Sequence, residues 1–372
     1  MIYLDNSATT QIYPEVKDAM LPYLMEEFGN PSSKYYSKAE NAKRAVEEAR
    51  ASLASLLGCN SSEIVFTSGS TESNNMIIKG VADYYQNQGN HIITTKVEHP
   101  SVLETCRYLE EKGFSITYLD VDQYGRIDLE DFQNSIKDTT ILVSIIWGNN
   151  ELGSLNDMES ISNVCLDKNI FLHTDATQVV GKIEFDMSAF PGITFLSCSA
   201  HKFHGPKGIG ATFIREDKYG ILTKFTPLLH GGGQEHGVRS GTLAVHNIVG
   251  MGKAADIVTL NLGKNIVKLK ELELYLCTIL NDKFGNQIKF NNDKENKIPG
   301  ILSVLFKGVN NELLLKTLAP MVAASTGSAC SSTKPSHVLE GIGLTLDEIR
   351  STVRFSISAL NGKEDLDIFR DL

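Results

Sequence analysis

The chain has 372 residues, of which 42% are hydrophobic, and its 35 basic and 45 acidic side chains leave a formal net charge of −10. This acidic balance argues against a sequence-independent nucleic-acid binder, which needs clustered lysine and arginine. No apolar run approaches the roughly 18 residues of a membrane span and no signal peptide is evident, so we expect a cytoplasmic globular protein of about two domains.

Helices and short apolar strands alternate through the first two thirds of the chain. Ala42, Val46, Ala49 and Leu53 recur at three- and four-residue steps and predict a helix over 37–57, with Ser37 and Glu40 as its capping box. The continuous apolar character of several strands indicates an α/β domain with a parallel or mixed sheet. The expected strands are Ile64–Thr67, His91–Thr95, Ile116–Val121, Ile141–Ile146, Ile170–Asp175, Phe195–Ser199 and Ile209–Ile214.

The last third of the chain has a different pattern. Periodicity is helical over the long stretch Val245–Asp282, and strand candidates reappear at Leu302–Phe306 and Val353–Ser358. We therefore expect a long connecting helix that leads into a smaller α+β domain.

A turn rich in glycine, serine and threonine follows the first buried strand, at Thr67–Asn75. Where such a turn opens a helix, backbone N–H groups and hydroxyls converge on one point and form an anion site suited to phosphate. An ordinary capped helix start is the alternative, because serine and threonine are preferred caps.

Two further strand ends carry chemically active side chains. Lys202 follows a strand between His201 and His204, ahead of a Gly/Pro-rich turn, which suits a Schiff-base lysine but also an ordinary surface lysine. Asp175 ends another strand, where ligands bind in open α/β sheets; a helix N-cap is the alternative. The glycine-rich stretch His230–Thr242 is either a backbone that passes close to a ligand or a flexible loop.

The six cysteines are scattered, with no CxxC pair and no metal-ligand spacing, so we expect neither a disulfide framework nor a metal site. Most of them are expected to be buried small hydrophobes. Cys330 differs because it lies among small polar residues, at Ser325–Ser332, and is a candidate accessible nucleophile. An unreactive exposed cysteine is the alternative.

In combination, these motifs resemble the pyridoxal-phosphate-dependent cysteine desulfurases of the nitrogen-fixation and iron–sulfur-cluster type, in the class V aminotransferase group. The resemblance spans essentially the whole chain and includes Tyr3–Thr10, Phe28–Ser33, Glu98–Pro100, Asn149–Gly153 and Arg354–Ser356. It implies an α/β structure of fold type I. A large domain at 13–255 would hold a mostly parallel seven-stranded sheet. Residues 1–12 and 256–372 would form the small domain, with the cysteine loop at about 325–336.

The resemblance also implies a cofactor site for pyridoxal 5′-phosphate. Lys202 would form the Schiff base, Asp175 would pair with the pyridinium nitrogen, His99 would stack on the ring as a catalytic residue, and Gln178 would bond the phenolic oxygen. The phosphate would be held by Ser70, Thr71, Ser199 and His201, with Thr242 reaching across from the partner subunit of a homodimer.

Substrate handling follows from the same resemblance. Asn150 and Arg354 would bind the carboxylate of L-cysteine, and Cys330 would take its sulfur as a persulfide and pass it to a sulfur-acceptor protein. The segment between Cys330 and the Pro335–His337 element is shorter than in the family. A selenocysteine lyase of the same fold and a non-catalytic iron–sulfur or metal-binding scaffold are the alternatives. Retained activity in Cys330→Ser would indicate the lyase, and a brown cluster would indicate the scaffold.

Overall fold

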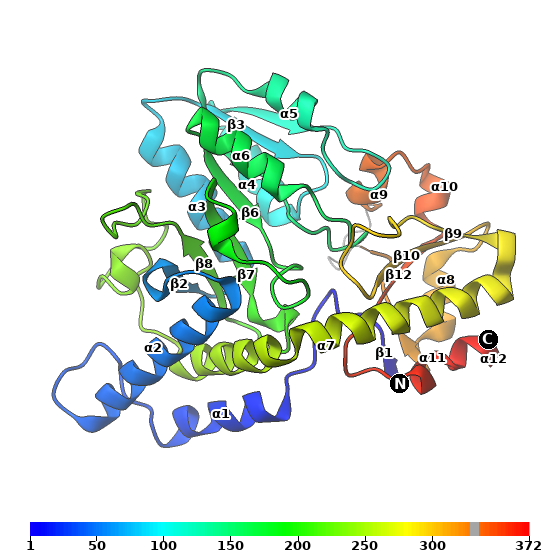
Figure 1. The fold of residues 1–372 in the computed structure, drawn as a ribbon, viewed down its shortest axis with the longest axis horizontal. Coiled ribbons are helices and arrows are strands. Elements are labelled where there is room, and N and C mark those ends of the chain that lie inside the picture. The colour runs from blue at the N-terminus through cyan, green and yellow to red at the C-terminus, as the bar shows by residue number, and fades with distance from the viewer. Residues whose placement is uncertain (328–334, 372) are drawn as a thin grey trace.

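The computed structural model describes residues 1–327 and 335–371, and its centre is a seven-stranded sheet (Figure 1). The strand order is β2-β8-β7-β6-β5-β3-β4, in which β8 is antiparallel to both neighbours and the other pairs are parallel. The mostly parallel sheet is therefore confirmed. Its strands are β2 (Ile64–Thr67), β3 (His91–Thr95), β4 (Ser115–Leu119), β5 (Thr140–Ser144), β6 (Phe171–Asp175), β7 (Ile193–Ser199) and β8 (Gly210–Ile214).

Both faces of this sheet are buried under helices, which explains the continuous apolar runs. Alternate residues of a strand go to opposite faces: Ile64 and Phe66 join one hydrophobic cluster, whereas Val65 joins the other. The first cluster includes residues of α1 (Pro14–Met25), α2 (Ser37–Leu57), α5 (Leu129–Ser135) and α6 (Met158–Lys168); the second includes α3 (Ser70–Tyr85) and α4 (Pro100–Glu110).

Helix α2 occupies the expected residues but begins differently from the expectation. Its N-cap is Tyr36, without a side-chain cap bond, so the capping box expected from Ser37 and Glu40 is wrong. The amides of Ala39 and Glu40 bond the carbonyl of Tyr36, which starts the helix one residue earlier than a Ser37 cap requires. Gly58 ends the helix in the left-handed region, at φ 68°.

The long helix α7 (Val245–Phe284) joins this sheet to a second, smaller layer, as Figure 1 shows. Its first half packs in the cluster of the large sheet through Ile248 and Met251, and its second half packs in a separate cluster through Leu272 and Leu276. The second layer comprises β1 (Ile2–Tyr3), β9 (Ile288–Phe290), β10 (Ile301–Phe306), α8 (Asn311–Leu318), β11 (Val322–Ala323), α9 (His337–Gly341), α10 (Leu346–Ile349), β12 (Thr352–Ser356), α11 (Lys363–Leu366) and α12 (Ile368–Asp371).

The division into domains at 13–255 and 256–372 remains our proposal, with its boundary inside α7. Two hydrophobic clusters share that helix, and the N-terminal arm contributes Leu4 to the second cluster and packs Ile12 against the first. None of the helices in the described part of the chain is long and apolar enough to cross a membrane.

Candidate active site

A cavity of about 160 Å³ lies at the carboxyl edge of the large sheet, where β2, β6 and β7 end. This edge is the usual ligand site of open α/β sheets. The cavity brings together most of the residues that the sequence pointed to: Ser70, Thr71, His99, Asn150, Asp175, Gln178, His201, Lys202 and Arg354. Ser199 and Thr242 do not line it, and Cys330 lies outside the described residues.

The amine of Lys202 is held at this edge by the N-terminal arm. Lys202 comes directly after β7, in a short 3₁₀ turn over Ala200–Lys202. Its Nζ donates to the backbone oxygens of Ser7 and Ala8, at 2.6 and 2.8 Å. Because both acceptors are backbone carbonyls, their position depends on the path of the arm and not on a side-chain rotamer.

Asp175 anchors a chain of polar contacts across the cavity. Its carboxylate accepts from Asn74 Nδ2 at 2.8 Å and from the amide of Thr177 at 3.0 Å. Asn74 Nδ2 also donates to Ser101 Oγ, which lies 2.8 Å from His99 Nδ1. The Asn74 amide of α3 thus holds the Asp175 carboxylate directly and the His99 imidazole through Ser101.

His99 is neutral in this environment. Burial lowers the pKa of His99, with the positive charge of Lys202 acting in the same direction and Asp175 opposing it. Since the amide of Ser101 donates to Nδ1 at 3.1 Å, the neutral ring carries its proton on Nε2.

The start of α3 forms the anion corner of the cavity. Its N-cap is Gly69, at φ 154°, and no side chain caps this 16-residue helix, so the N–H groups of its first turn remain for a ligand. Ser70 and Thr71 add hydroxyls at the same point. Gly210 of β8 allows this turn to come close, because a Cβ there would lie 2.6 Å from Gly69 Cα.

Two neighbours shape the charge of this corner. Burial, assisted by the charge of Lys202, lowers the pKa of His201 to about 4, so its ring is neutral near pH 7. Burial raises the pKa of Glu72, but hydrogen bonds from Arg239 and Ser68 outweigh it and the net shift is downward. The Glu72 carboxylate is paired with Arg239 at 2.7 Å, which reduces its repulsion of an anion.

Arg354 reaches the opposite side of the cavity from β12 of the smaller layer. Its guanidinium donates to Asp5 Oδ1 at 2.8 Å and to the backbone oxygens of Asn150 and Gly327, both at 2.9 Å. Among the described residues, its buried Nε has no acceptor. The two-pronged fork expected for a substrate carboxylate is thus already occupied in part by Asp5; beyond these three bonds, the Nε–H and one N–H of Nη2 remain as donors.

Several residues at the cavity had no role assigned from the sequence, among them Ser7, His337 and Asn74. Ser7 and His337 line the cavity, and Asn74 bonds Asp175 behind it. Asn74 carried a weak signal, because it lies four residues after Ser70 and therefore on the same face of α3. Ser7 and His337 lie inside the segments Tyr3–Thr10 and Pro335–His337 named in the sequence, but no role was assigned to either residue.

The donor set fits pyridoxal phosphate. An uncapped helix start with two hydroxyls suits the phosphate, a buried carboxylate suits a protonated pyridine nitrogen, and the amine of Lys202 suits the aldehyde. Among the described residues, no group of three metal-ligating side chains occurs.

Known proteins resemble the chain along its whole length. It matches the Aminotransferase class-V family over residues 2–369. It is 43% identical over 374 residues to a protein named cysteine desulfurase IscS of Dictyoglomus turgidum, covering 100% of this chain and 93% of that protein. The solved structure of a NifS-like protein superposes with a TM-score of 0.92 at 36% identity, covering 100% and 97% of the two chains. A structure of SspA in complex with cysteine gives a TM-score of 0.85 at 36% identity, covering 97% and 100%.

These matches confirm the resemblance drawn from the motifs and the fold that it implied. The chain belongs to the cysteine desulfurase group of the aminotransferase class V family.

Proposed function

We propose that this chain is a cysteine desulfurase that uses pyridoxal 5′-phosphate to convert L-cysteine into L-alanine and a persulfide on Cys330. The observation that carries the proposal is the cavity, in which the Lys202 amine, the Asp175 carboxylate and the uncapped start of α3 converge. The whole-chain similarity to proteins named cysteine desulfurase supports it, and a structural relative is described in complex with cysteine.

The cofactor, when bound, supplies an electron sink for the substrate carbon next to the amine. The residues of the chain orient the substrate and move its protons. Lys202 supplies the amine that moves a proton at the substrate Cα. Neutral His99 carries a proton on Nε2 that it can donate inside the cavity. Asn150 and Arg354 orient the substrate carboxylate, Arg354 through Nε. Ser199 and Thr242 complete the phosphate contacts.

The sulfur goes to Cys330, which gains an S–S bond as the substrate C–S bond breaks. None of the five other cysteines lines the cavity. Burial raises the pKa of Cys106, Cys165 and Cys198 to about 12, so these three thiols stay protonated and weakly nucleophilic. The persulfide would then pass to a sulfur-acceptor protein in the cytoplasm, for iron–sulfur cluster assembly or another thiolation pathway.

We further propose that the enzyme works as a homodimer. Thr242 is exposed and outside the cavity of its own chain, so it is available to the phosphate corner of a partner. Exposed apolar side chains gather on α1 and the segment after it, including Met25 at 75%, Phe28 at 69% and Tyr35 at 94% exposed. A surface of this kind marks an interaction site. Sedimentation equilibrium of the purified protein gives the oligomeric state.

The decisive experiment measures alanine and sulfide released from L-cysteine in the presence of a reductant, with the visible spectrum recorded alongside. The wild type is expected to release both, while Cys330→Ser keeps the cofactor absorbance and loses sulfide. Cys277→Ser, a half-buried cysteine of α7, is the matched control and should behave as the wild type. Sulfide release by Cys330→Ser would instead indicate a lyase.

A further inference from the structure

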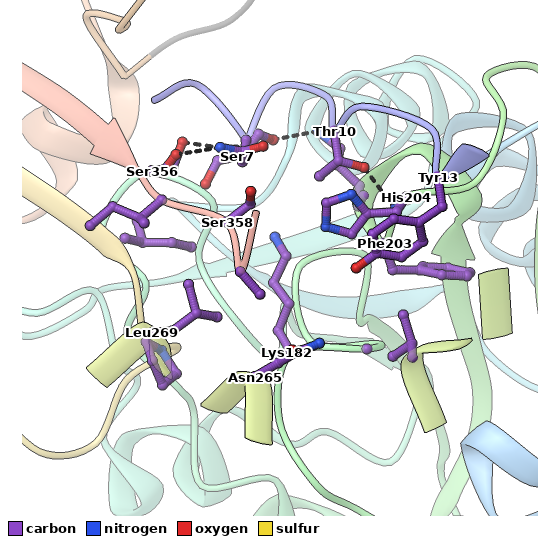
Figure 2. A pocket seen from close by; sticks show the side chains of 18 residues that line it. Ser7, Thr10, Tyr13, Lys182, Phe203, His204, Asn265, Leu269, Ser356 and Ser358 are labelled. Atoms are coloured by element: carbon purple, nitrogen blue, oxygen red, sulfur yellow. Dashed lines mark hydrogen bonds between the residues drawn. The ribbon is translucent and has the colours of Figure 1, made fainter. Parts of the chain in front are cut away.

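A second, smaller cavity of about 40 Å³ lies behind Lys202, at the middle of α7 where the two hydrophobic clusters meet (Figure 2). Lys182 and Lys202 both line it, with Ser7 from the N-terminal arm, Asn265 from α7 and Ser358 after β12. Figure 2 shows the Lys182 side chain extended into this space, with its amine toward the side of Ser7 and Ser358. The function proposed above assigns no role to this second lysine.

Lys182 is connected to Lys202 by one amide and one carbonyl. Its Nζ donates to Gln178 Oε1 at 2.6 Å, and Gln178 Nε2 donates to the backbone oxygen of Ser7 at 2.8 Å. Lys202 Nζ donates to that same Ser7 oxygen at 2.6 Å. Gln178 also lines the larger cavity, so its amide stands between the two amines and faces the cofactor site.

The chemistry of these groups sets the orientation of the Gln178 amide. A charged lysine amine can only donate hydrogen bonds, so the oxygen of the Gln178 amide must face Lys182. The Ser7 carbonyl can only accept them, so the nitrogen of that amide must face the arm and the larger cavity. Positive charge at the oxygen end also polarises the amide and strengthens its N–H groups as donors. Without Lys182, the buried oxygen of Gln178 would lose its donor and the amide would be held from one side only.

The surroundings of Lys182 argue against a plain ion-pair role. No aspartate or glutamate is among the described residues that line its cavity, whereas Lys202, Tyr13 and His204 face the same space. Lys182 is partly exposed along its length, but burial of its amine lowers its pKa to about 7, with the charges of Lys202 and Arg354 adding to the effect. A buried amine without a carboxylate partner destabilises the fold, and such groups gather at functional sites.

We propose that Lys182 is a positioning residue of the active site, which acts through Gln178 to hold the amide that faces the cofactor. The inference rests on the proposed function, because affinity for pyridoxal phosphate is its readout. It assigns Lys182 no contact with the cofactor or the substrate.

A double-mutant cycle tests the inference. Apo protein of the wild type, Lys182→Met, Gln178→Met and the double variant is titrated with pyridoxal phosphate at pH 6 and pH 8.5, and the dissociation constant is measured. At pH 6, Lys182→Met should weaken binding by about tenfold, the loss of one hydrogen bond from a charged donor. The double variant should bind about as weakly as Gln178→Met, because Lys182 acts only through that amide. Lys297→Met removes a buried lysine of the smaller layer, bound to Glu273, and should leave affinity unchanged.

The loss of affinity in Lys182→Met should be smaller at pH 8.5, where the wild-type amine is neutral and donates more weakly. Three results would overturn the role of Lys182. The affinity losses of the two single variants could multiply in the double variant, the loss in Lys182→Met could be the same at both pH values, or Lys182→Met could bind pyridoxal phosphate as the wild type does. Failure of the wild type to bind pyridoxal phosphate would instead refute the proposed function. Circular dichroism of each variant establishes that it is folded.

Discussion

Glu235 holds the glycine-rich loop that ends in Thr242, and its removal should weaken the fold measurably. Its carboxylate, 1% exposed, accepts from both terminal nitrogens of Arg50, at 2.7 and 2.9 Å, and from the amide of Phe66 at 2.7 Å. Arg50 lies on α2, and its side chain is 5% exposed. Glu235 itself adopts a left-handed backbone, at φ 49°, which a non-glycine residue keeps only when its contacts demand it.

The expected cost of Glu235→Gln follows from these contacts. The variant keeps the size of the side chain but leaves a buried guanidinium without its carboxylate, which costs about 3–5 kcal/mol. Glu47, which lies 3.2 Å from Arg50 and is 56% exposed, compensates part of the lost charge, so we expect a cost at the lower end of that range. With an unfolding entropy of about 2.1 cal/mol/K per residue over 372 residues, a loss of about 3 kcal/mol lowers Tm by about 4 °C.

Differential scanning calorimetry of the apo protein measures this shift. The matched control is Asp367→Asn, which removes a carboxylate from an ion pair with Arg370 whose members are both 50% exposed. Solvent screens an exposed pair, so the control should shift Tm by about 1 °C at most. Equal shifts in the two variants would refute the reasoning that burial makes the Arg50–Glu235 pair costly to break.

Two further predictions concern residues next to the cavity. Gly210→Ala should weaken binding of pyridoxal phosphate and destabilise the fold by about 1–3 kcal/mol, because the added Cβ would lie 2.6 Å from the turn before α3. The control is Gly263→Ala, on the exposed face of α7, which should leave stability unchanged or increase it. Burial, with a smaller contribution from Asp175, raises the pKa of Glu98 to about 8, above its unfolded value. The folded state therefore keeps an extra proton at Glu98, and the contribution of this group to the unfolding free energy falls as pH rises from 5 to 8. In urea denaturation, Glu98→Gln should remove that contribution, so its unfolding free energy should rise relative to that of the wild type as pH rises; a difference that does not change with pH would contradict the assignment.

The sequence predicted the residues that sit at element ends. Asp175 ends β6 and Lys202 follows β7, and strands of a mostly parallel sheet bring their carboxyl ends to one edge. A polar side chain directly after an apolar run could therefore be assigned to the cavity before the structure was known. Ser70 and Thr71 follow the same rule through the glycine that opens α3.

Contacts between distant segments had no such signal. Arg354 was expected to present a free fork, but it donates to Asp5, 349 residues away in the chain. The link from Lys182 to Lys202 through Gln178 depends on the Ser7 carbonyl, whose position no local pattern encodes. Backbone oxygens carry no residue identity, so a site that uses them is invisible to an argument from residue types.

The N-terminal arm is the element that joins these distant parts. The carbonyl of Ser7 accepts from the Lys202 amine and from the side-chain amide of Gln178, while the backbone amide of Ser7 donates to Ser356 Oγ of β12 at 2.8 Å. Asp5 bonds Arg354, and the amide of Thr10 bonds the carbonyl of His201 at 2.8 Å. The arm thus contacts the Lys202 turn of the large sheet and β12 of the small one through the same few residues. The geometry of the active site therefore requires both layers to be docked on the arm, and cofactor affinity should report that docking and not the folding of the large sheet alone.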